Sequence, residues 1–375
     1  MPQESLNIEM KLDGRSSRYI LGPLACLELA HFVPHPPPVY LVDQAVAERH
    51  PHWLEEIQVG CDGQGHRALI LPGGEQVKSF ARLIEIYEWL AERDVPRDGA
   101  LVAVGGGTIL DLAGLAASTW RRGIHFVAIP TTLLAMVDAA IGGKTAVNAV
   151  GLKNPVGTFH PAGAILADCG FLASLPCWAW RDGMAEMVKT AVLGGVWLFD
   201  DLHGRRADLA RILGDRDPDE PVPHILGALP WREWIGQAAS IKARIVGRDF
   251  REGTIRRTLN LGHTLGHALE AWSLETDNPL THGQAVSVGM AVLCRLAAER
   301  GTFPVASSVQ VIELLESCGL PVRCEAPPAE ELARLLAGDK KVGSADGLRW
   351  VLPRTIGNMD IDGRVSVPEL LKWLD

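Results

Sequence analysis

Short apolar runs alternate with amphipathic stretches throughout the first half of the chain. Strands are predicted at residues 39–42, 68–72, 100–105, 125–130 and 164–168. Between them, residues 79–94 and 109–122 place apolar side chains at helical spacing. Because consecutive parallel strands need a helical crossover, this alternation predicts a mainly parallel sheet covered by helices.

The pattern changes from about residue 177 onward. Residues 231–250 and 283–301 show long helical periodicities, and strand signals nearly vanish. We therefore expect an α/β domain over residues 1–176 and an all-α domain over residues 177–375. The polar, proline-containing stretch 214–224 is expected to form an exposed loop.

Composition narrows the class of protein. A chain of 375 residues with 47% hydrophobic residues can bury a core in each of two domains. The net charge of -9 argues against nucleic acid as a partner. The N-terminus lacks the layout of a signal peptide, and no apolar run reaches the ~18 residues of a membrane span. The 7 scattered cysteines contain no C-x-x-C pair, which suits a reducing, cytoplasmic location.

The stretch VAVGGGTILDLAG, residues 102–114, places three glycines between a predicted strand and a predicted helix. Such glycines let the backbone approach a pyrophosphate at the N-terminus of the helix. The spacing is not that of G-x-G-x-x-G. A nucleotide site and a simple tight turn therefore both remain open for this stretch.

Four polar residues are embedded in the otherwise apolar or glycine-rich segment 129–161: Asp138, Lys144, Lys153 and Asn154. Lys and Asp are rarely buried without a partner. Polar groups in this setting favour a ligand site over an internal Asp–Lys salt bridge.

More polar side chains gather in the second half of the chain, at Glu186, Lys189, Lys242, Arg256, Asn260, His263, His267 and His282. A carboxylate and two imidazoles with an open position could form a three-ligand metal site. Taken one by one, the same residues are also typical of helix caps, core positions, and surface pairs such as Glu186–Lys189. His263 and His267 lie one helical turn apart, and this spacing is compatible with a metal clamp, a substrate site or a core edge. Together the motifs indicate a cavity between a nucleotide domain and a helical domain, with a Glu/His/His metal and cations for an anionic substrate.

From about residue 70 to its C-terminus the chain resembles the 3-dehydroquinate synthases, which are sugar phosphate cyclases. The matching blocks run in order along the chain: GEQ-x-K (74–78), GGG-x-x-x-D (105–111), RG (122–123), PTTLLA-x-VD-x-x-x-GGKT (130–145), GLKN (151–154), FL-x-x-LP (171–176), AE-x-x-K (185–189), LN-x-GHT-x-GHA-x-E (259–270), HG-x-AV (282–286) and DKK (339–341). The resemblance implies a Rossmann-like NAD-binding domain followed by the helical domain.

The resemblance also implies the cofactors and their residues. A divalent metal, zinc or cobalt, would be held by Glu186, His263 and His282. NAD would contact Glu75, Lys78, Gly106, Gly107, Asp111, Thr131, Thr132, Lys144, Lys153 and Ser174.

The substrate implied by the resemblance is a sugar-acid phosphate, 3-deoxy-D-arabino-heptulosonate 7-phosphate. Its site would comprise Asp138, Lys144, Asn154, Lys189, Lys242, Arg256, Asn260, His267, Lys341 and, reaching in from a neighbouring subunit, Arg122. Arg256 and Lys242 suit the carboxylate, because a guanidinium matches a planar carboxylate. The phosphate would be held by Lys144, Asn154, Asn260, His267 and the partner's Arg122. The role of Arg122 implies a homodimer.

In the reaction implied by the resemblance, NAD⁺ is regenerated within each turnover. NAD⁺ oxidises the C5 hydroxyl with the metal as Lewis acid, and phosphate leaves by β-elimination. The hydride then returns, the ring opens, and an intramolecular aldol step closes the carbocycle. The substrate phosphate can take the C6 proton, so a protein base is not required.

The alternatives differ in substrate or in class. A related cyclase would act on sedoheptulose 7-phosphate, or would be an amino-dehydroquinate synthase. A metal-dependent polyol dehydrogenase would need fewer cations, and a binding module would leave the metal residues without a purpose.

Departures from the family pattern are Gln284 for Glu, Met184 for Trp and Trp120 for Tyr. Gln284 leaves open the charge beside His282.

Overall fold

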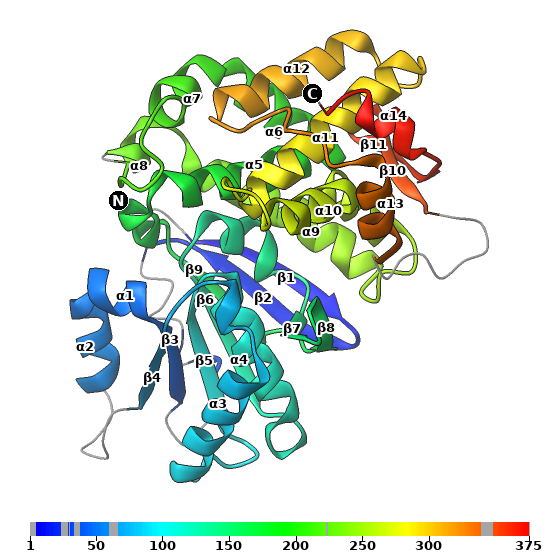
Figure 1. Ribbon diagram of the computed structural model, residues 1–375. Helices are drawn as coiled ribbons and strands as arrows, with labels where there is room; N and C mark the ends of the chain where they lie inside the picture. Colours follow the sequence, from blue (N-terminus) through cyan, green and yellow to red (C-terminus); the bar gives the residue numbers. More distant parts are fainter. Residues whose placement is uncertain are drawn as a thin grey trace. The chain divides into compact units, whose positions relative to one another are not determined.

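The computed structural model describes residues 5–23, 29, 31–33, 38–59, 67–222, 224–338 and 348–374. The chain forms two compact units (Figure 1). Unit 1 comprises residues 1–175 and 223–251, and unit 2 comprises residues 176–222 and 252–375. The chain first leaves unit 1 close to the expected boundary at residue 176. Residues 223–251, however, were expected in the helical domain and belong to unit 1.

The core of unit 1 is a seven-stranded sheet in the order β1-β2-β9-β6-β5-β3-β4. Its strands are β1 (Leu6–Leu12), β2 (Arg15–Leu21), β3 (Val39–Asp43), β4 (Ala68–Leu71), β5 (Ala100–Gly105), β6 (His125–Pro130) and β9 (Ala164–Ala167). Among these described strands, only β1 runs antiparallel to its neighbour. The expected mainly parallel α/β sheet is therefore confirmed.

Helices cover this sheet because its central strands are apolar on both sides. All six residues of β5 are buried. Val102 and Val104 of β5 join Tyr40 and Val42 of β3 in one core cluster, on which Trp53 packs. Helix α4 contacts β3, β5 and β6. Strands buried on both faces read as continuous apolar runs, which is why these strands could be predicted.

The helices of unit 1 are α1 (Gln44–Arg49), α2 (Pro51–Val59), η2 (Glu75–Val77), α3 (Phe80–Glu92), α4 (Gly107–Thr119), η3 (Trp120–Arg122), the π-helical turn η4 (Ala135–Ala139), η5 (Cys169–Ser174), α8 (Ile225–Ala228) and α9 (Trp231–Arg248). A separate hairpin is formed by β7 (Lys144–Ala149) and β8 (Leu152–Phe159). Helix α9 returns to unit 1 because it packs on β1, β2 and η4. A Cβ on Gly236 of α9 would lie 2.5 Å from Leu6 Cδ2, so a larger residue at this position would displace the Leu6 side chain.

Unit 2 is helical, as expected. Its helices are α5 (Cys177–Gly194), α6 (Val196–Gly204), α7 (Arg206–Leu213), η6 (Ile255–Asn260), α10 (His263–Ser273), α11 (His282–Glu299), α12 (Val305–Ser317), α13 (Ala329–Gly338) and α14 (Val367–Leu371). One antiparallel hairpin was not expected, formed by β10 (Trp350–Thr355) and β11 (Asn358–Gly363). Helix α11 begins with a capping box in which Gln284 accepts from Thr281 N at 2.9 Å. Because Gln serves at this position as well as Glu, the departure at Gln284 preserves the cap.

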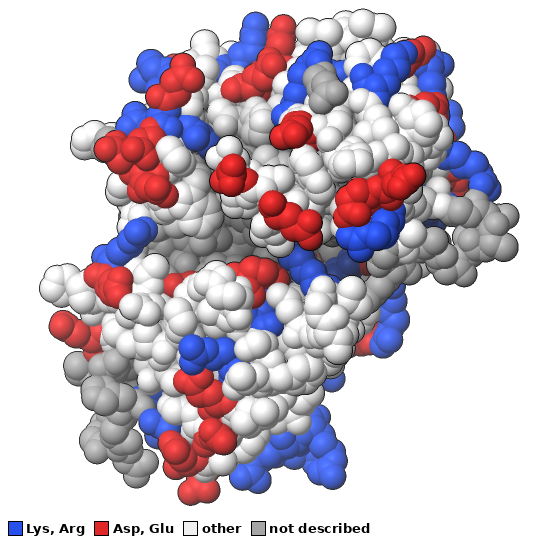
Figure 2. All heavy atoms as spheres, in the orientation of Figure 1, with Lys and Arg blue, Asp and Glu red and all other residues white. Residues whose placement is uncertain are grey.

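Among the described residues, no helix combines the length and apolar character that a membrane span requires. Cys169, Cys177, Cys294, Cys318 and Cys324 are free thiols. The two other cysteines, at 26 and 61, lie outside the described residues. On the face shown in Figure 2, acidic and basic side chains are interspersed.

Candidate active site

Three predicted metal ligands meet in unit 2 at the starts of two helices. Glu186 lies in the middle of α5, whereas His263 and His282 are the first residues of α10 and α11. Both imidazoles direct Nε2 at the same carboxylate oxygen, Glu186 Oε1, at 3.3 Å from His263 and 3.4 Å from His282. The three ligand atoms lie within 4.8 Å of one another, so one ion could contact all three.

The second nitrogen of each histidine faces an acceptor. His263 Nδ1 lies 3.2 Å from Leu261 O. His282 Nδ1 lies 3.5 Å from Glu270 Oε2. When the ring is neutral, donation from Nδ1 to these oxygens leaves Nε2 as the free ligand atom, as in most protein metal sites.

Glu186 meets the requirements of a metal ligand. Its side chain is 1% exposed, and the described residues give neither carboxylate oxygen a hydrogen bond of regular geometry. Burial alone would raise the pKa of Glu186, but the Lys189 ammonium and the His263 imidazole beside it hold the pKa well below its usual value. A buried, ionised carboxylate with two imidazoles is a donor set typical of zinc and cobalt. The residues present therefore fit a divalent metal.

The two histidines differ in their charge environment. Burial lowers the pKa of His263, and the Lys189 ammonium lowers it further. Burial would also lower the pKa of His282, but Glu186 and Glu270 raise it to about 9. Because a metal ligand must be deprotonated, an ion bound at His282 replaces this proton.

The other predicted residues of unit 2 lie near these helices in sequence. The His267 ring lies 5.4 Å from the His263 ring and 6.0 Å from that of His282. Arg256 is buried at 3% exposure in η6. Asn260 Nδ2 donates to Glu252 Oε1 at 2.8 Å. Lys341, with the rest of the DKK motif, lies outside the described residues.

In unit 1, the glycine motif forms the turn from β5 into α4. Gly105 ends β5, Gly106 is the N-cap residue and Gly107 begins the helix. A Cβ on Gly105 would lie 2.9 Å from Ile109 Cβ, and a Cβ on Gly106 would lie 3.2 Å from Thr132 Cγ2. A side chain at Gly105 would therefore force a shift of the helix, and one at Gly106 would crowd Thr132. The turn presents the N-terminus of α4, an electropositive helix end suited to a pyrophosphate.

A polar network lies beside this turn. Lys78 is 3% exposed, and its Nζ donates to Asp111 Oδ2 at 2.7 Å and to Asn154 Oδ1 at 2.5 Å. Glu75 Oε1 lies 3.8 Å from the same Nζ. Burial raises the pKa of Asp111, and the Lys78 ammonium partly offsets this rise. The structure thus brings together four residues from three separate stretches of the sequence.

A second pair in unit 1 joins α9 to η4. Lys242 Nζ lies 2.6 Å from Asp138 Oδ1 and donates to the Asp138 carbonyl at 2.6 Å. Asp138 of the segment 129–161 therefore does form an internal Asp–Lys pair, but its partner Lys242 lies outside that segment.

The remaining predicted residues of unit 1 lie at element ends. Lys144 begins β7 and is exposed, as is Lys153 in β8. Thr131 is buried directly after β6. Ser174 ends η5, and its Oγ lies 2.9 Å from His50 Nε2. Arg122 is exposed in η3 and has a left-handed φ of 69°.

Four acidic residues at these sites were not predicted as site residues: Asp43, Asp182, Glu252 and Glu270. Asp43 ends β3, and its Cβ lies 3.0 Å from the position of a Cβ built on Gly105 of the glycine turn. Asp182 precedes Glu186 by one turn of α5, and Glu270 stands in the GHA-x-E block. Burial raises the pKa of Asp182 to about 6, against hydrogen bonds from Thr281 and Gly283. For Glu252 the sequence carried no signal.

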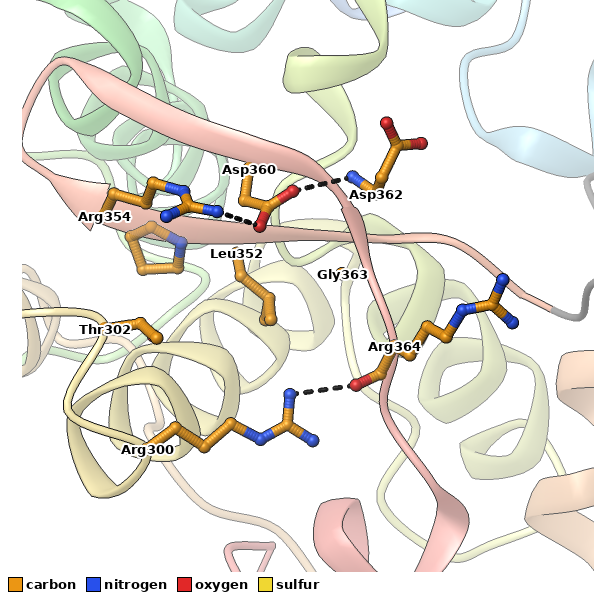
Figure 3. Close-up of a pocket in the computed structure, with 9 residues that line it drawn as sticks. Arg300, Thr302, Leu352, Arg354, Asp360, Asp362, Gly363 and Arg364 are labelled. Atoms are coloured by element: carbon orange, nitrogen blue, oxygen red, sulfur yellow. Dashed lines mark hydrogen bonds and ion pairs between the residues drawn. The ribbon is translucent and has the colours of Figure 1, made fainter.

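A separate cavity of about 330 Å³ lies in unit 2 at the β10–β11 hairpin and contains none of the predicted residues (Figure 3). Arg354 Nη2 donates to Asp360 Oδ2 at 2.7 Å, and Arg300 Nη1 donates to the Arg364 carbonyl at 2.9 Å. The first bond joins the two strands of the hairpin, and the second joins the end of α11 to the segment that follows β11. The lining arginines that Figure 3 shows in dashed contacts are therefore engaged by the protein itself.

Solved structures define the class of protein to which this fold belongs. A 2-epi-5-epi-valiolone synthase from Streptomyces hygroscopicus subsp. jinggangensis 5008, with NAD⁺ and Zn²⁺ bound, has a TM-score of 0.82 and 29% identity over 98% of this chain and 97% of its own. A 2-deoxy-scyllo-inosose synthase complexed with carbaglucose-6-phosphate, NAD⁺ and Co²⁺ has a TM-score of 0.80 at 23% identity, covering 98% of this chain and 99% of its own, which shows a shared fold. The fold is that of the sugar phosphate cyclases.

Sequence comparisons give the family within this class. Residues 68–182 match the model of the 3-dehydroquinate synthase N-terminal domain, and residues 183–342 match that of the C-terminal domain. A 3-dehydroquinate synthase from Synechococcus sp. (strain CC9605) is 40% identical over 308 residues, which are 82% of this chain and 79% of that protein. One from Cereibacter sphaeroides (strain ATCC 17025 / ATH 2.4.3) is 38% identical over 362 residues, 93% and 92% of the two chains. The chain belongs to the 3-dehydroquinate synthase family.

Proposed function

We propose that this protein converts 3-deoxy-D-arabino-heptulosonate 7-phosphate to 3-dehydroquinate and phosphate, a lyase step of the shikimate pathway, which leads to chorismate and the aromatic amino acids. Membership of the family supports the reaction. The observation on the molecule that carries it is the convergence of His263 and His282 on the buried carboxylate of Glu186. The cofactors are NAD and one divalent metal, zinc or cobalt.

The metal would be held by Glu186, His263 and His282. When bound, it acts as a Lewis acid that favours the alkoxide form of the substrate C5 hydroxyl. Lys189, which pairs with Glu186, keeps that carboxylate ionised. Glu186 can therefore act as a ligand without first losing a proton.

Bound NAD would accept and return the hydride. We assign its binding to the glycine turn and the network beside it, through Glu75, Lys78, Gly106, Gly107, Asp111, Thr131, Thr132, Lys144, Lys153 and Ser174. The N-terminus of α4 is suited to the pyrophosphate. The missed Asp43, at the carboxyl end of β3, suits a ribose hydroxyl because a carboxylate accepts two hydrogen bonds.

The remaining residues are assigned to the substrate. Arg256 and Lys242 hold the carboxylate. The planar guanidinium of Arg256 matches the planar carboxylate and can donate two hydrogen bonds to it. The phosphate is held by Lys144, Asn154, Asn260, His267 and the partner's Arg122. Asp138 orients Lys242 through their 2.6 Å pair. Lys189 and Lys341 complete the set of cations, and the leaving phosphate serves as the acceptor of the C6 proton.

We also propose that the enzyme is a cytoplasmic homodimer. Within the described residues strand β8 pairs only with β7, and its Leu152, Val156 and Phe159 are 49%, 42% and 40% exposed. An exposed apolar edge strand is a surface that proteins normally cover. The hairpin packs on α4, whose C-terminal end leads directly into Arg122. A second copy seated on this surface would carry Arg122 to its neighbour.

The nearest alternative is a cyclase for sedoheptulose 7-phosphate, a substrate without a carboxylate. The purified protein with NAD⁺ and Zn²⁺ or Co²⁺ should release phosphate from the keto-acid phosphate at least about 100-fold more efficiently than from sedoheptulose 7-phosphate. Without a substrate carboxylate, the buried cations Arg256 and Lys242 would be left unpaired, which is unfavourable. A preference for sedoheptulose 7-phosphate would favour the alternative. Turnover of neither substrate would overturn the proposal.

A further inference from the structure

We propose that Asn148, which the family resemblance did not single out, is a positioning residue of the nucleotide site. It joins Glu75, Lys78 and Asn154 into one network. The inference rests on the proposed function, because it takes Glu75 and Lys78 as NAD contacts and Asn154 as a phosphate contact.

Asn148 lies where the β7–β8 ladder is irregular. Val147 pairs with Val156 and Ala149 with Leu152, and the register shifts between these two pairs. Asn148 therefore has no partner in this described ladder. Its backbone N–H donates instead to the Lys78 carbonyl at 2.8 Å. Such bulges often redirect a side chain toward a site.

The side-chain amide of Asn148 links two further residues. Its Nδ2 donates to Glu75 Oε1 at 2.9 Å, and its Oδ1 accepts from Asn154 N at 2.8 Å. A carboxylate can only accept and a backbone N–H can only donate, so the two partners fix the orientation of the amide. No side chain of another type provides a donor and an acceptor in this planar geometry at the same length.

The bond to Asn154 has a local consequence. Asn154 has a φ of 55°, in the left-handed region that non-glycine residues adopt at a cost. The bond from Asn154 N to Asn148 holds the backbone there. In this conformation Asn154 Oδ1 accepts from Lys78 Nζ, which also binds Asp111. Asn148 thus holds the Glu75 carboxylate in place through Nδ2. Through Oδ1 it also holds Asn154, the residue that accepts from Lys78.

Two substitutions separate the two halves of this role. Asn148→Ala removes the side-chain bonds to Glu75 and to Asn154. Asn148→Asp keeps an acceptor for Asn154 N but places a carboxylate against Glu75. We expect NAD⁺ affinity, measured by calorimetry on the metal-loaded protein without substrate, to fall about 10-fold in the Ala variant and at least as much in the Asp variant, since a donor to a charged group is lost or replaced by repulsion.

The reciprocal change tests the contact itself. In a Glu75→Gln background, the introduced amide can donate to the carboxylate that Asn148→Asp creates. Asn148→Asp should therefore weaken NAD⁺ binding much less in that background than it does beside the native Glu75. Val150→Ala is the matched control, because Val150 lies two residues away at 90% exposure. This control should bind NAD⁺ as the parent does. All variants should retain their metal, which unit 2 holds.

Several results would overturn the inference. One is parental NAD⁺ affinity in both Asn148 variants. Another is an equal effect of Asn148→Asp in the native and the Glu75→Gln backgrounds. A lowered melting temperature with unchanged affinity would show that Asn148 only stabilises the hairpin. If a variant fails to fold, Asn148→Ser, which keeps a small polar group, replaces it with the same expectations. Failure of the parent itself to bind NAD⁺ would refute the proposed function instead.

Discussion

His263 and His267 lie one turn apart on α10, yet their surroundings differ. His263 Nε2 lies 3.3 Å from the Glu186 carboxylate, and its Nδ1 faces the Leu261 carbonyl. His267 also lies within reach of His282 and Glu270, so the described residues contain a second grouping of possible ligands. Within that grouping, His282 Nδ1 already lies 3.5 Å from Glu270 Oε2. We therefore favour one metal at Glu186 and a substrate role for His267.

This division of roles predicts different losses in two variants. His263→Ala should lower zinc affinity by at least about 100-fold, because it removes a direct ligand and not merely a supporting contact. His267→Ala should retain the metal and lose phosphate release. Metal content after dialysis, measured by mass spectrometry, distinguishes the two. Equal metal loss in both variants would show that the roles are divided wrongly.

At the scale of single residues, the local sequence did not show which residues are buried or which distant residues they contact. The Glu186–Lys189 spacing is typical of a surface pair, but the structure buries both residues because α5 is covered on all sides. Nothing within α5 alone shows this. The roles of Asn148 and Asp182 depend on partners about 70 and 100 residues away, so no local pattern could show them.

At the scale of elements, the positions of Glu186 and His282 depend on the contact between α5 and α11. Asp182 of α5 accepts from Gly283 N at 3.1 Å and from the Thr281 hydroxyl, at the first turn of α11. A Cβ on Gly283 would lie 2.4 Å from Asp182 Cα, so the two helices meet backbone to backbone. One turn further along α5 lies Glu186. The contact therefore fixes the distance between these two metal ligands.

Loss of this contact should affect both stability and metal binding. We expect Asp182→Ala to destabilise the fold by about 1–3 kcal/mol, because the buried Gly283 N–H and the half-buried Thr281 hydroxyl lose their acceptor. Zinc affinity should fall with it. The measurements are urea unfolding and zinc titration. Asp208→Ala, which removes only an exposed i,i+3 pair with Arg211, is the control and should change neither. Unchanged zinc affinity in Asp182→Ala would contradict a link between the contact and the site.

The strands that were predicted from the sequence are those that form continuous apolar runs. The five predicted strands each coincide with an observed strand to within a residue at either end, because their residues are largely apolar and, except in β4, largely buried. Strands β1 and β2 were missed because neither forms the continuous apolar run of a central strand. Leu6, Ile8, Met10 and Leu12 of β1 nevertheless alternate with polar residues, and this period-two pattern was a signal for a half-buried strand. Strand β8 was missed because it is exposed along most of its length and contains proline and glycine. Such a strand has no hydrophobic pattern of period two.

At the scale of the whole molecule, the sequence indicated an α/β part and a helical part, and both exist. It did not show that α9 belongs with the sheet, because a helix periodicity reports which face is buried and not against what. Packing of α9 on β1 and β2 decides its place. Lys242 thereby lies in the same unit as its partner Asp138.

The proposed homodimer predicts complementation between two inactive variants. Arg122→Ala lacks the residue donated to the neighbour, and His263→Ala lacks a metal ligand in its own site. A mixed dimer has one site with an intact metal centre and the partner's Arg122. After refolding a mixture of equal amounts, about a quarter of the sites should be active, as a symmetric two-fold interface requires. No recovery of phosphate release would contradict donation of Arg122 across the interface.

The central claim is that NAD⁺ is reduced by the substrate and then regenerated within each turnover. The most direct test follows phosphate and NADH together, with the metal-loaded protein, NAD⁺ and the keto-acid phosphate. We predict many equivalents of phosphate per enzyme with no net rise in NADH absorbance, and no NADH from glycerol or other simple polyols. Steady accumulation of NADH, whether from the keto-acid phosphate or from polyols, would contradict the account and indicate a dehydrogenase.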